Sequence, residues 1–146
     1  MDYQPRNYRN NIQKSDLFAF RVVVKETDLH IQTDRPLERI AKESILHHRY
    51  ILENYIHMYP VFATTLAPWP GEGPRPRLID MMIQAGRKAG VGPMASVAGT
   101  IAACVGEDLL EHSKEVVVEN GGQVCFYVPA LAVSSNCRKA LFQNLS

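Results

Sequence analysis

The sequence predicts an α+β fold in which β-hairpins pack with one long helix and two shorter helices. Two runs of β-branched and apolar residues, near residues 17–32 and 115–128, are each interrupted by a short polar or glycine turn. Three segments between these runs repeat apolar residues at helical spacing. The chain has 146 residues, which is the length of a single domain with its own core.

The first predicted element is a strand pair from Leu17 to Gln32. The runs FAFRVVV and LHIQ are rich in β-branched, aromatic and other apolar residues, and the polar segment Lys25–Asp28 separates them. Four polar residues in this position are typical of a solvated turn. The alternative is that they belong to a binding site.

A helix of about 20 residues, roughly 30 Å long, is predicted to follow and to end near Met58. Asp34 is the candidate N-cap, and Pro36 suits the first turn. Apolar residues then recur close to the helical period until Pro60, which ends the helix.

Two shorter helices are predicted after a loop at residues 61–76, where prolines and glycines cluster. The first spans Arg77 to Lys88 and ends at Gly90. The second begins at Pro93, which suits the first position of a helix, and carries Met94 to about Val105.

A second hairpin completes the predicted fold. Residues 107–112 form a short helical turn before it. A β-branched strand spans Glu115 to Glu119, Asn120-Gly121-Gly122 form the turn, and Gln123 to Val128 form the paired strand. No secondary structure is predicted for residues 134–146, where the periodicity is lost.

Charge and composition exclude several classes of partner. The net charge is +1, from 16 basic and 15 acidic side chains, which gives no general attraction to nucleic acid or to anionic lipid. The sequence contains no apolar run of the roughly 20 residues that cross a bilayer, and its first residues lack the apolar region of a secretory signal. We expect a cytoplasmic protein that binds neither nucleic acid nor membrane. Its three cysteines lack C-x-x-C spacing, which argues against a disulfide framework and a structural zinc site.

The segment from Gly90 to Gly99 is the first candidate binding site, because glycines precede a helix start that is rich in small side chains. The N–H groups at such a helix start bind a phosphate or another anion, and Ser96 would add a hydroxyl. The alternative is structural. Ala95, Gly99 and Ala102 share one helix face, which would let the helix pack tightly against a sheet or a partner subunit.

The turn at Asn120, Gly121 and Gly122, which follows Glu119, is the second candidate. Asn-Gly is a common hairpin turn, which is the structural interpretation. The functional interpretation is that the glycines allow positive φ beneath a planar or phosphorylated ligand while Asn120 donates and accepts hydrogen bonds. No arrangement of residues typical of a catalytic triad or a paired-carboxylate site is present, so catalytic residues and metal ligands are not predicted.

Taken together and in order, several motifs resemble the uncharacterised family related to ApbE, the FAD:protein FMN transferases. The resemblance covers about residues 8–125. The motifs are Tyr8-Arg9, Lys25–Leu29, Tyr59–Phe62, Leu66–Pro68, Ala89–Ala95 with Val97–Gly99, and Val118–Gly122.

The resemblance implies an ApbE-like α+β fold, of which residues 1–128 form the N-terminal part and residues 129–146 a divergent tail. It implies a small-molecule nucleotide ligand, FAD, used by the transferases together with magnesium. By the same resemblance, Asn120, Gly121 and Gly122, with Glu119 as a weaker member, contact the ligand. The ligand's phosphates would lie at the helix start formed by Gly92, Pro93, Met94 and Ser96.

The chain also departs from the family pattern. Gln123 stands where the resemblance leads us to expect an aspartate, and the metal-binding aspartate and threonine of the transferases belong to a later part of the family pattern. The first hypothesis is a flavin- or nucleotide-binding protein, with flavin transferase activity at most. The alternatives are a non-catalytic accessory protein of sulfur or cofactor metabolism, or an incomplete domain without independent activity. A homo-oligomer formed through the edge of the second hairpin is a further expectation.

Overall fold

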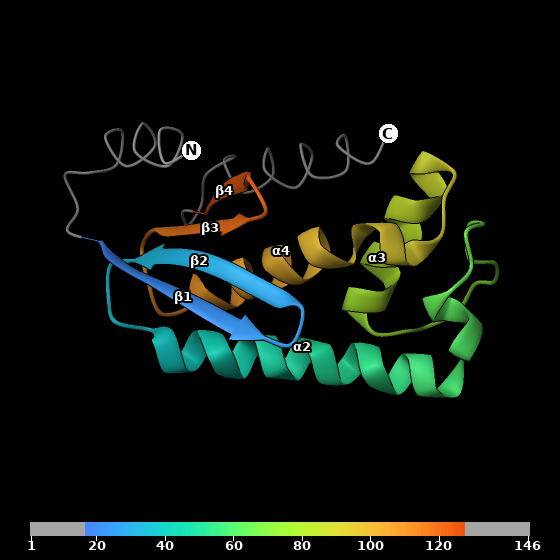
Figure 1. Cartoon of the computed structure of the whole chain (residues 1–146), viewed down its shortest axis with the longest axis horizontal. Helices are drawn as coiled ribbons and strands as arrows, with labels where there is room; N and C mark the ends of the chain where they lie inside the picture. The colour runs from blue at the N-terminus through green and yellow to red at the C-terminus, as the bar shows by residue number, and fades with distance from the viewer. Residues whose placement is uncertain (1–16, 128–146) are drawn as a thin grey trace.

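The computed structural model describes residues 17–127 and confirms the α+β class (Figure 1). Three helices and a four-stranded antiparallel sheet make up the described part. In chain order the elements are β1 (Phe18–Val24), β2 (Thr27–Thr33), α2 (Glu38–Met58), the 3₁₀ turn η1 (Pro60–Ala63), α3 (Arg77–Ala89), the 3₁₀ turn η2 (Pro93–Ser96), α4 (Val97–Leu109), β3 (Val116–Asn120) and β4 (Gln123–Tyr127).

The sheet has the strand order β1-β2-β3-β4, and each neighbouring pair is antiparallel. Its register places one set of alternating side chains on a single buried face, because residues opposite each other across a ladder point to the same side. The set consists of Val22, Leu29, Ile31, Thr33, Val116, Val118 and Cys125.

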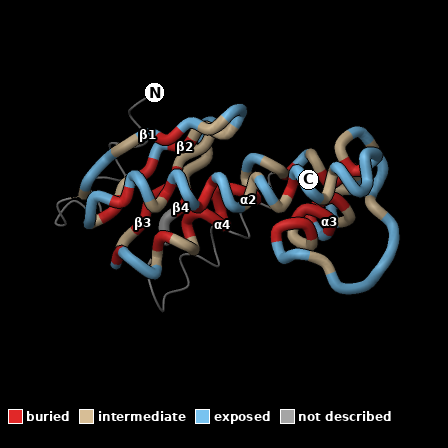
Figure 2. The backbone as a smooth tube through the Cα atoms, turned by 90° about the horizontal axis from the view of Figure 1, so that it is seen from below, coloured by how far each residue is buried: buried red, intermediate tan, exposed pale blue. Residues whose placement is uncertain are grey.

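The helices cover that face. α2 contacts β1, α4 contacts β3 and β4, and the two helices contact each other, whereas α3 packs on α4, η2 and α2 beyond the end of the sheet (Figure 2). Within residues 17–127 no single helix is long and apolar enough to cross a membrane. The segments α3 and η2–α4 reach the required length and composition only as a pair bent by 107°.

The core lies between the sheet and the helices and continues under α3. Phe62, Met82 and Val105 are fully buried in it. The ring of Phe62 meets those of Tyr55 and Trp69 edge to face, with centroids 4.9 Å and 5.0 Å away, which is a favourable aromatic arrangement.

Cys125 contradicts the expectation, drawn from the cysteine spacing, that the chain forms no disulfide. Its side chain is buried against the core, as an apolar strand position predicts, but it is disulfide-bonded. Of the remaining two cysteines, Cys104 is buried in α4 and Cys137 lies outside the described residues.

The start of α2 also differs from the prediction. Asp34 does not cap the helix, which begins at Glu38 with Leu37 at the N-cap position. The Asp34 carboxylate instead accepts the backbone N–H of Lys114 at 2.8 Å, and the Asp34 N–H donates to the Ser113 hydroxyl at 3.0 Å. The carboxylate therefore fastens the segment before α2 to the segment before β3.

The predicted helix from Met94 to Val105 is displaced toward the C-terminus. Pro93 begins a 3₁₀ turn, in which the N–H of Ala95 donates to the Gly92 carbonyl and the N–H of Val97 donates to the Met94 carbonyl. The α-helix then runs to Leu109, so residues 107–112, predicted as a separate turn, are its last residues and the hydrogen-bonded turn after it.

Candidate functional site

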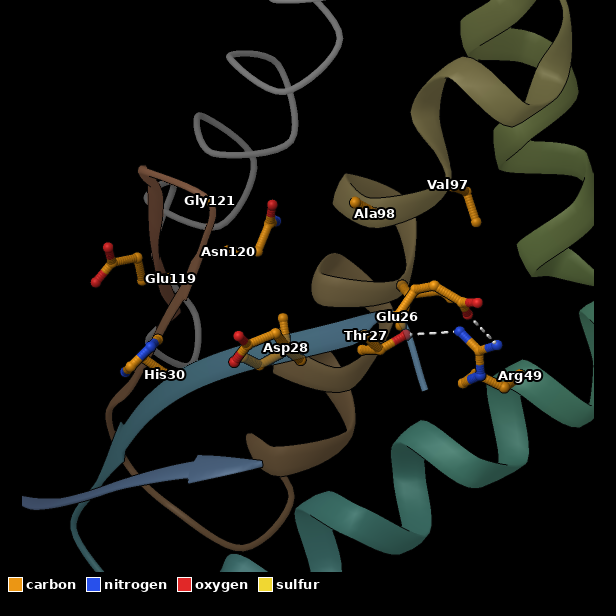
Figure 3. Close-up of a pocket in the computed structure, with 12 residues that line it drawn as sticks. Glu26, Thr27, Asp28, His30, Arg49, Val97, Ala98, Glu119, Asn120 and Gly121 are labelled. Carbon is orange, nitrogen blue, oxygen red and sulfur yellow. Dashed lines mark hydrogen bonds and ion pairs between the residues drawn. The ribbon is translucent and has the colours of Figure 1, made fainter. Parts of the chain in front are cut away.

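A cavity of about 450 Å³ opens where β2 and β3 part (Figure 3). Pairing between β2 and β3 stops at His30 and Glu119, although β2 remains paired with β1 back to Thr27 and β3 with β4 on to Asn120. The two strands therefore diverge at this end of the sheet. The cavity is lined by Glu26, Thr27, Asp28, Leu29, His30, Arg49, Val97, Ala98, Ile101, Glu119, Asn120 and Gly121.

Three segments far apart in the sequence meet at this cavity. The first is the turn and start of β2, the second is the first turns of α4, and the third is the end of β3 with its glycine turn. Each belongs to a motif that the sequence singles out: Lys25–Leu29, Val97–Gly99 and Val118–Gly122. The fold brings the three motifs together around one space.

α4 supplies an apolar wall. Val97, Ala98 and Ile101 line the cavity from this helix, and the buried side chain of Leu29 lines it from β2. The small side chain of Ala98 is exposed, which leaves room beside it. Such a wall suits the face of a flat, apolar ring system, because ligand pockets are lined mainly by apolar groups with a few polar ones for orientation.

The glycine turn supplies a polar wall. Gly121 and Gly122 have φ values of +56° and +95°, which side chains other than glycine adopt rarely. Asn120 is the last residue of β3 rather than part of the turn, and its amide lies at the cavity (Figure 3). This side chain can both donate and accept hydrogen bonds.

Arg49 of α2 closes one end of the cavity. Its side chain is only 13% exposed. Nη1 donates to the Thr27 hydroxyl at 2.9 Å, and Nη2 donates to the Glu26 carboxylate at 2.9 Å (Figure 3). A longer contact of 3.4 Å joins Nη2 to Glu53 one helical turn further on. Arg49 therefore ties the β1–β2 turn to α2.

Two carboxylates of the cavity are paired with arginines. Asp28 accepts two hydrogen bonds from Arg21, at 2.9 Å and 2.7 Å, and these bonds hold the pKa of Asp28 below its usual value. The pKa of Glu26 is also lowered, first by a hydrogen bond from its own backbone N–H and then by Arg49. Both groups are therefore carboxylates at neutral pH.

The predicted residues at the helix start do not line the cavity, although Val97, the next residue, does. Gly92, Pro93, Met94 and Ser96 are not among its lining residues, and neither is Gly122. The Ser96 hydroxyl is buried and donates to the Pro93 carbonyl at 3.3 Å. Met94 packs against the core. Glu119, Asn120 and Gly121 are the predicted residues that the structure places at the cavity.

Gly92 has a packing explanation of its own. A Cβ at this position would lie 2.0 Å from the carbonyl oxygen of Thr65 and 3.3 Å from the Cα of Leu66. Two backbone segments therefore approach each other so closely here that only glycine fits.

Arg49 is the charged cavity residue of α2 that was not predicted from the sequence. A signal was available, because Arg49 follows Ala41 and Ile45 and precedes Leu52 on the apolar stripe of α2. A charged residue on the buried face of an amphipathic helix requires a partner inside the fold.

A second polar cluster joins α2 to α4. The Ser44 hydroxyl donates to Oδ2 of Asp108 at 2.7 Å, and Nε2 of His48 lies 2.8 Å from the same oxygen. Because serine and histidine both meet the carboxylate rather than each other, the cluster lacks the order of a nucleophilic triad. Burial alone would raise the pKa of Asp108, but the hydrogen bonds that its carboxylate accepts from His48 and Ser44 outweigh burial, so this pKa is lowered.

Within residues 17–127, no three histidine, cysteine, aspartate or glutamate side chains are grouped to hold a metal ion. The fold and cavity define the described part of this chain as an α+β domain with a cavity of small-molecule size at the parted strands.

The chain belongs to the family described as AbpE bacteria, whose model matches residues 9–143. This match continues past residue 128, after which the sequence analysis expects a divergent tail. The boundary at 128 stays a prediction.

Several archaeal proteins are similar in sequence. A UPF0280 protein of Methanococcus maripaludis strain C7 is 39% identical over 110 residues, which cover 74% of this chain and 44% of the relative. A UPF0280 protein of Methanococcus vannielii is 40% identical over 111 residues, covering 75% and 45%, respectively. A UPF0280 protein of Methanocaldococcus jannaschii is 39% identical over 109 residues, covering 74% and 44%. The chain therefore spans less than half the length of these relatives.

Proposed function

We propose that the chain binds a small nucleotide, with a flavin nucleotide as the first candidate, in the cavity between β2, β3 and α4. One observation carries the proposal: the parting of β2 and β3 gathers three sequence motifs around a single space of about 450 Å³. Small-molecule sites commonly have volumes of roughly 300–1,000 Å³.

The chemistry of the walls suits a nucleotide. The apolar wall of α4 offers Val97 and Ile101 to the face of a ring, and the Asn120 amide offers a donor and an acceptor to the ring edge. The parted strands add backbone N–H and C=O groups that the ladder between β2 and β3 no longer uses. Arg49 is a cation at one end of the cavity (Figure 3).

Magnesium does not fit the described cavity. Its octahedral shell needs several oxygen ligands, and within residues 17–127 no three acidic, histidine or cysteine side chains are grouped to hold a metal ion. The proposal is therefore nucleotide binding, and we derive no transfer of FMN from these residues. The resemblance to the FAD:protein FMN transferases supports the choice of flavin as the first ligand to test.

The test is titration calorimetry of the purified protein with FAD, with and without magnesium. Asn120→Ala removes the amide at the cavity, and Asn54→Ala removes an exposed amide of α2 as the matched control. We expect saturable binding that Asn120→Ala weakens by roughly tenfold, which is the effect of losing about one hydrogen bond. Asn54→Ala should bind like the wild type.

Two results would contradict the proposal. The absence of binding heat at protein concentrations of tens of micromolar would rule out FAD as the ligand. Equal binding by the wild type and Asn120→Ala would place the ligand elsewhere.

A second candidate function is a non-catalytic interaction protein. Exposed apolar side chains at the end of α2 and in the following segment support it: Met58, Tyr59, Val61 and Leu66 are 47–87% exposed. These four side chains come from one short segment, and large exposed apolar patches are typical of contacts with other proteins. This candidate predicts a concentration-dependent oligomer in light scattering and no heat with FAD.

A further inference from the structure

Arg49 is held in an environment that suits the recognition of an anion. The guanidinium lines the cavity and is largely buried, and its Nε has no hydrogen-bond partner among the described residues. Nε is itself buried, so a ligand would reach the guanidinium through Nη1 and Nη2, the two nitrogens that face Thr27 and Glu26 (Figure 3).

Glu26, which occupies the Nη2 side of this guanidinium, is easily displaced. Its side chain is 87% exposed and belongs to the two-residue turn between β1 and β2. The released Glu26 carboxylate is well solvated, and an incoming phosphate would take its place as the counter-ion that the buried guanidinium requires. A change of side-chain rotamer would return the Glu26 carboxylate to water without moving a strand.

The charges of the cavity are separated along its length. Figure 3 shows Arg49 with Glu26 and Thr27 at one end and Glu119 with His30 at the other, with Asn120 between them. The carboxylate of Asp28 is engaged by Arg21. The Arg49 end is therefore the part of the cavity that can accept a negative group.

We propose that Arg49 binds the phosphate of the ligand and that Glu26 is an internal stand-in for that phosphate, released when the ligand binds. The inference rests on the proposed nucleotide binding and adds which end of the ligand lies at which wall. A guanidinium presents a planar fork of donors that matches two phosphate oxygens, whereas Glu26 makes one contact of 2.9 Å in the structure. Thr27 continues to accept the Nη1 hydrogen bond and keeps the guanidinium in place.

Riboflavin and FMN make a matched pair of probes, since they differ by one phosphate. Their affinities are measured by flavin fluorescence for the wild type, Glu26→Gln and Arg49→Lys. Glu43→Gln is the control, because Glu43 is an exposed glutamate that forms a comparable ion pair with Arg39 at 2.8 Å. Thermal stabilisation by pyrophosphate of the wild type and Glu26→Gln reports the anion site without a flavin.

The expected result is that the wild type prefers FMN to riboflavin and that Glu26→Gln increases FMN affinity by about two- to fivefold, the size of a weak exposed ion pair. Riboflavin affinity should not change. Arg49→Lys should keep the fold and reduce the preference for FMN, because an ammonium is not a bidentate donor. Glu43→Gln should have no effect, and pyrophosphate should stabilise Glu26→Gln more than the wild type.

The failures of the two proposals are distinguishable. If riboflavin and FMN bind equally to the wild type and to Glu26→Gln, the nucleotide site stands and the role of Arg49 is refuted. If pyrophosphate stabilises the protein but neither flavin binds, the anion site at Arg49 is supported and the proposal of a flavin ligand is refuted. If neither flavin binds and pyrophosphate does not stabilise Glu26→Gln, both proposals fall.

Discussion

Replacing Gly92 with alanine tests whether this glycine serves packing or a ligand. Its φ and ψ of −71° and 163° are allowed for alanine, so the backbone conformation itself is not strained. The added Cβ would lie 2.0 Å from the Thr65 carbonyl oxygen and 3.0 Å from its carbon. These atoms belong to the backbone and cannot rotate away, so the segment from Thr65 to Leu66 must move.

The expected loss in the free energy of unfolding is about 1–3 kcal/mol, the range for overpacking a well-packed site. Alanine also reduces the entropy of the unfolded chain, which offsets roughly 0.4–1 kcal/mol of that loss. The net effect should remain destabilising, because an overlap of this depth with backbone cannot be relieved by a rotamer change.

Urea unfolding followed by tryptophan fluorescence is the assay. Trp69 is the only tryptophan of the chain, and its ring packs on Phe62 in the same region. Leu66→Ala is the control, since this side chain is 87% exposed and its removal should change stability by less than about 0.5 kcal/mol. An unfolding curve for Gly92→Ala that coincides with the wild-type curve would refute the packing explanation. Weaker flavin binding at unchanged stability would favour the ligand role predicted from the sequence.

Two further predictions concern stability. Asp108→Asn should lower the free energy of unfolding by about 1 kcal/mol at pH 7, a modest value because Asp108 is half exposed and two hydrogen bonds converge on it. The pKa of Asp108 in the fold is below its usual value of 3.8, so its contribution is present above that pH and is lost as the pH falls through the lowered pKa. Urea titrations from pH 7 to pH 2 should therefore show the two proteins converging, and a constant difference would contradict the assignment. Phe62→Ala should cost about 3–5 kcal/mol in the same urea assay, because the ring is fully buried between Tyr55 and Trp69. A loss below 1 kcal/mol would mean that the site collapses around the smaller side chain.

Local patterns were sufficient to predict the regular elements. Secondary structure follows from neighbouring residues in three cases: the apolar stripe of α2, the proline that ends this helix, and the β-branched run of β3. The structure places these elements close to the predicted residues. Asp34 is a residue whose role could not be predicted from its sequence neighbours. Its position predicts an N-cap, but Ser113 and Lys114, distant in sequence, supply the partners that it actually uses.

The candidate site was predictable only where local sequence motifs contribute to it. The motifs around Asn120 and Val97 stand out in the sequence, and the structure places both at the cavity. Gly92 belongs to an equally conspicuous motif, yet its explanation requires the backbone of Thr65, which no local pattern reveals. Arg49 looks like an ordinary helical cation until the register of the first hairpin brings Glu26 and Thr27 against it.

The short ladder between β2 and β3 has a consequence for the order of folding. Each hairpin closes through a tight turn between adjacent strands, whereas the pairing of His30 with Glu119 joins opposite ends of the described chain across all three helices. Contacts this distant in sequence carry a large loop-closure entropy and tend to form late. We expect the cavity to be completed by this last pairing, so that a nascent or partly unfolded chain has hairpins and helices but cannot bind ligand.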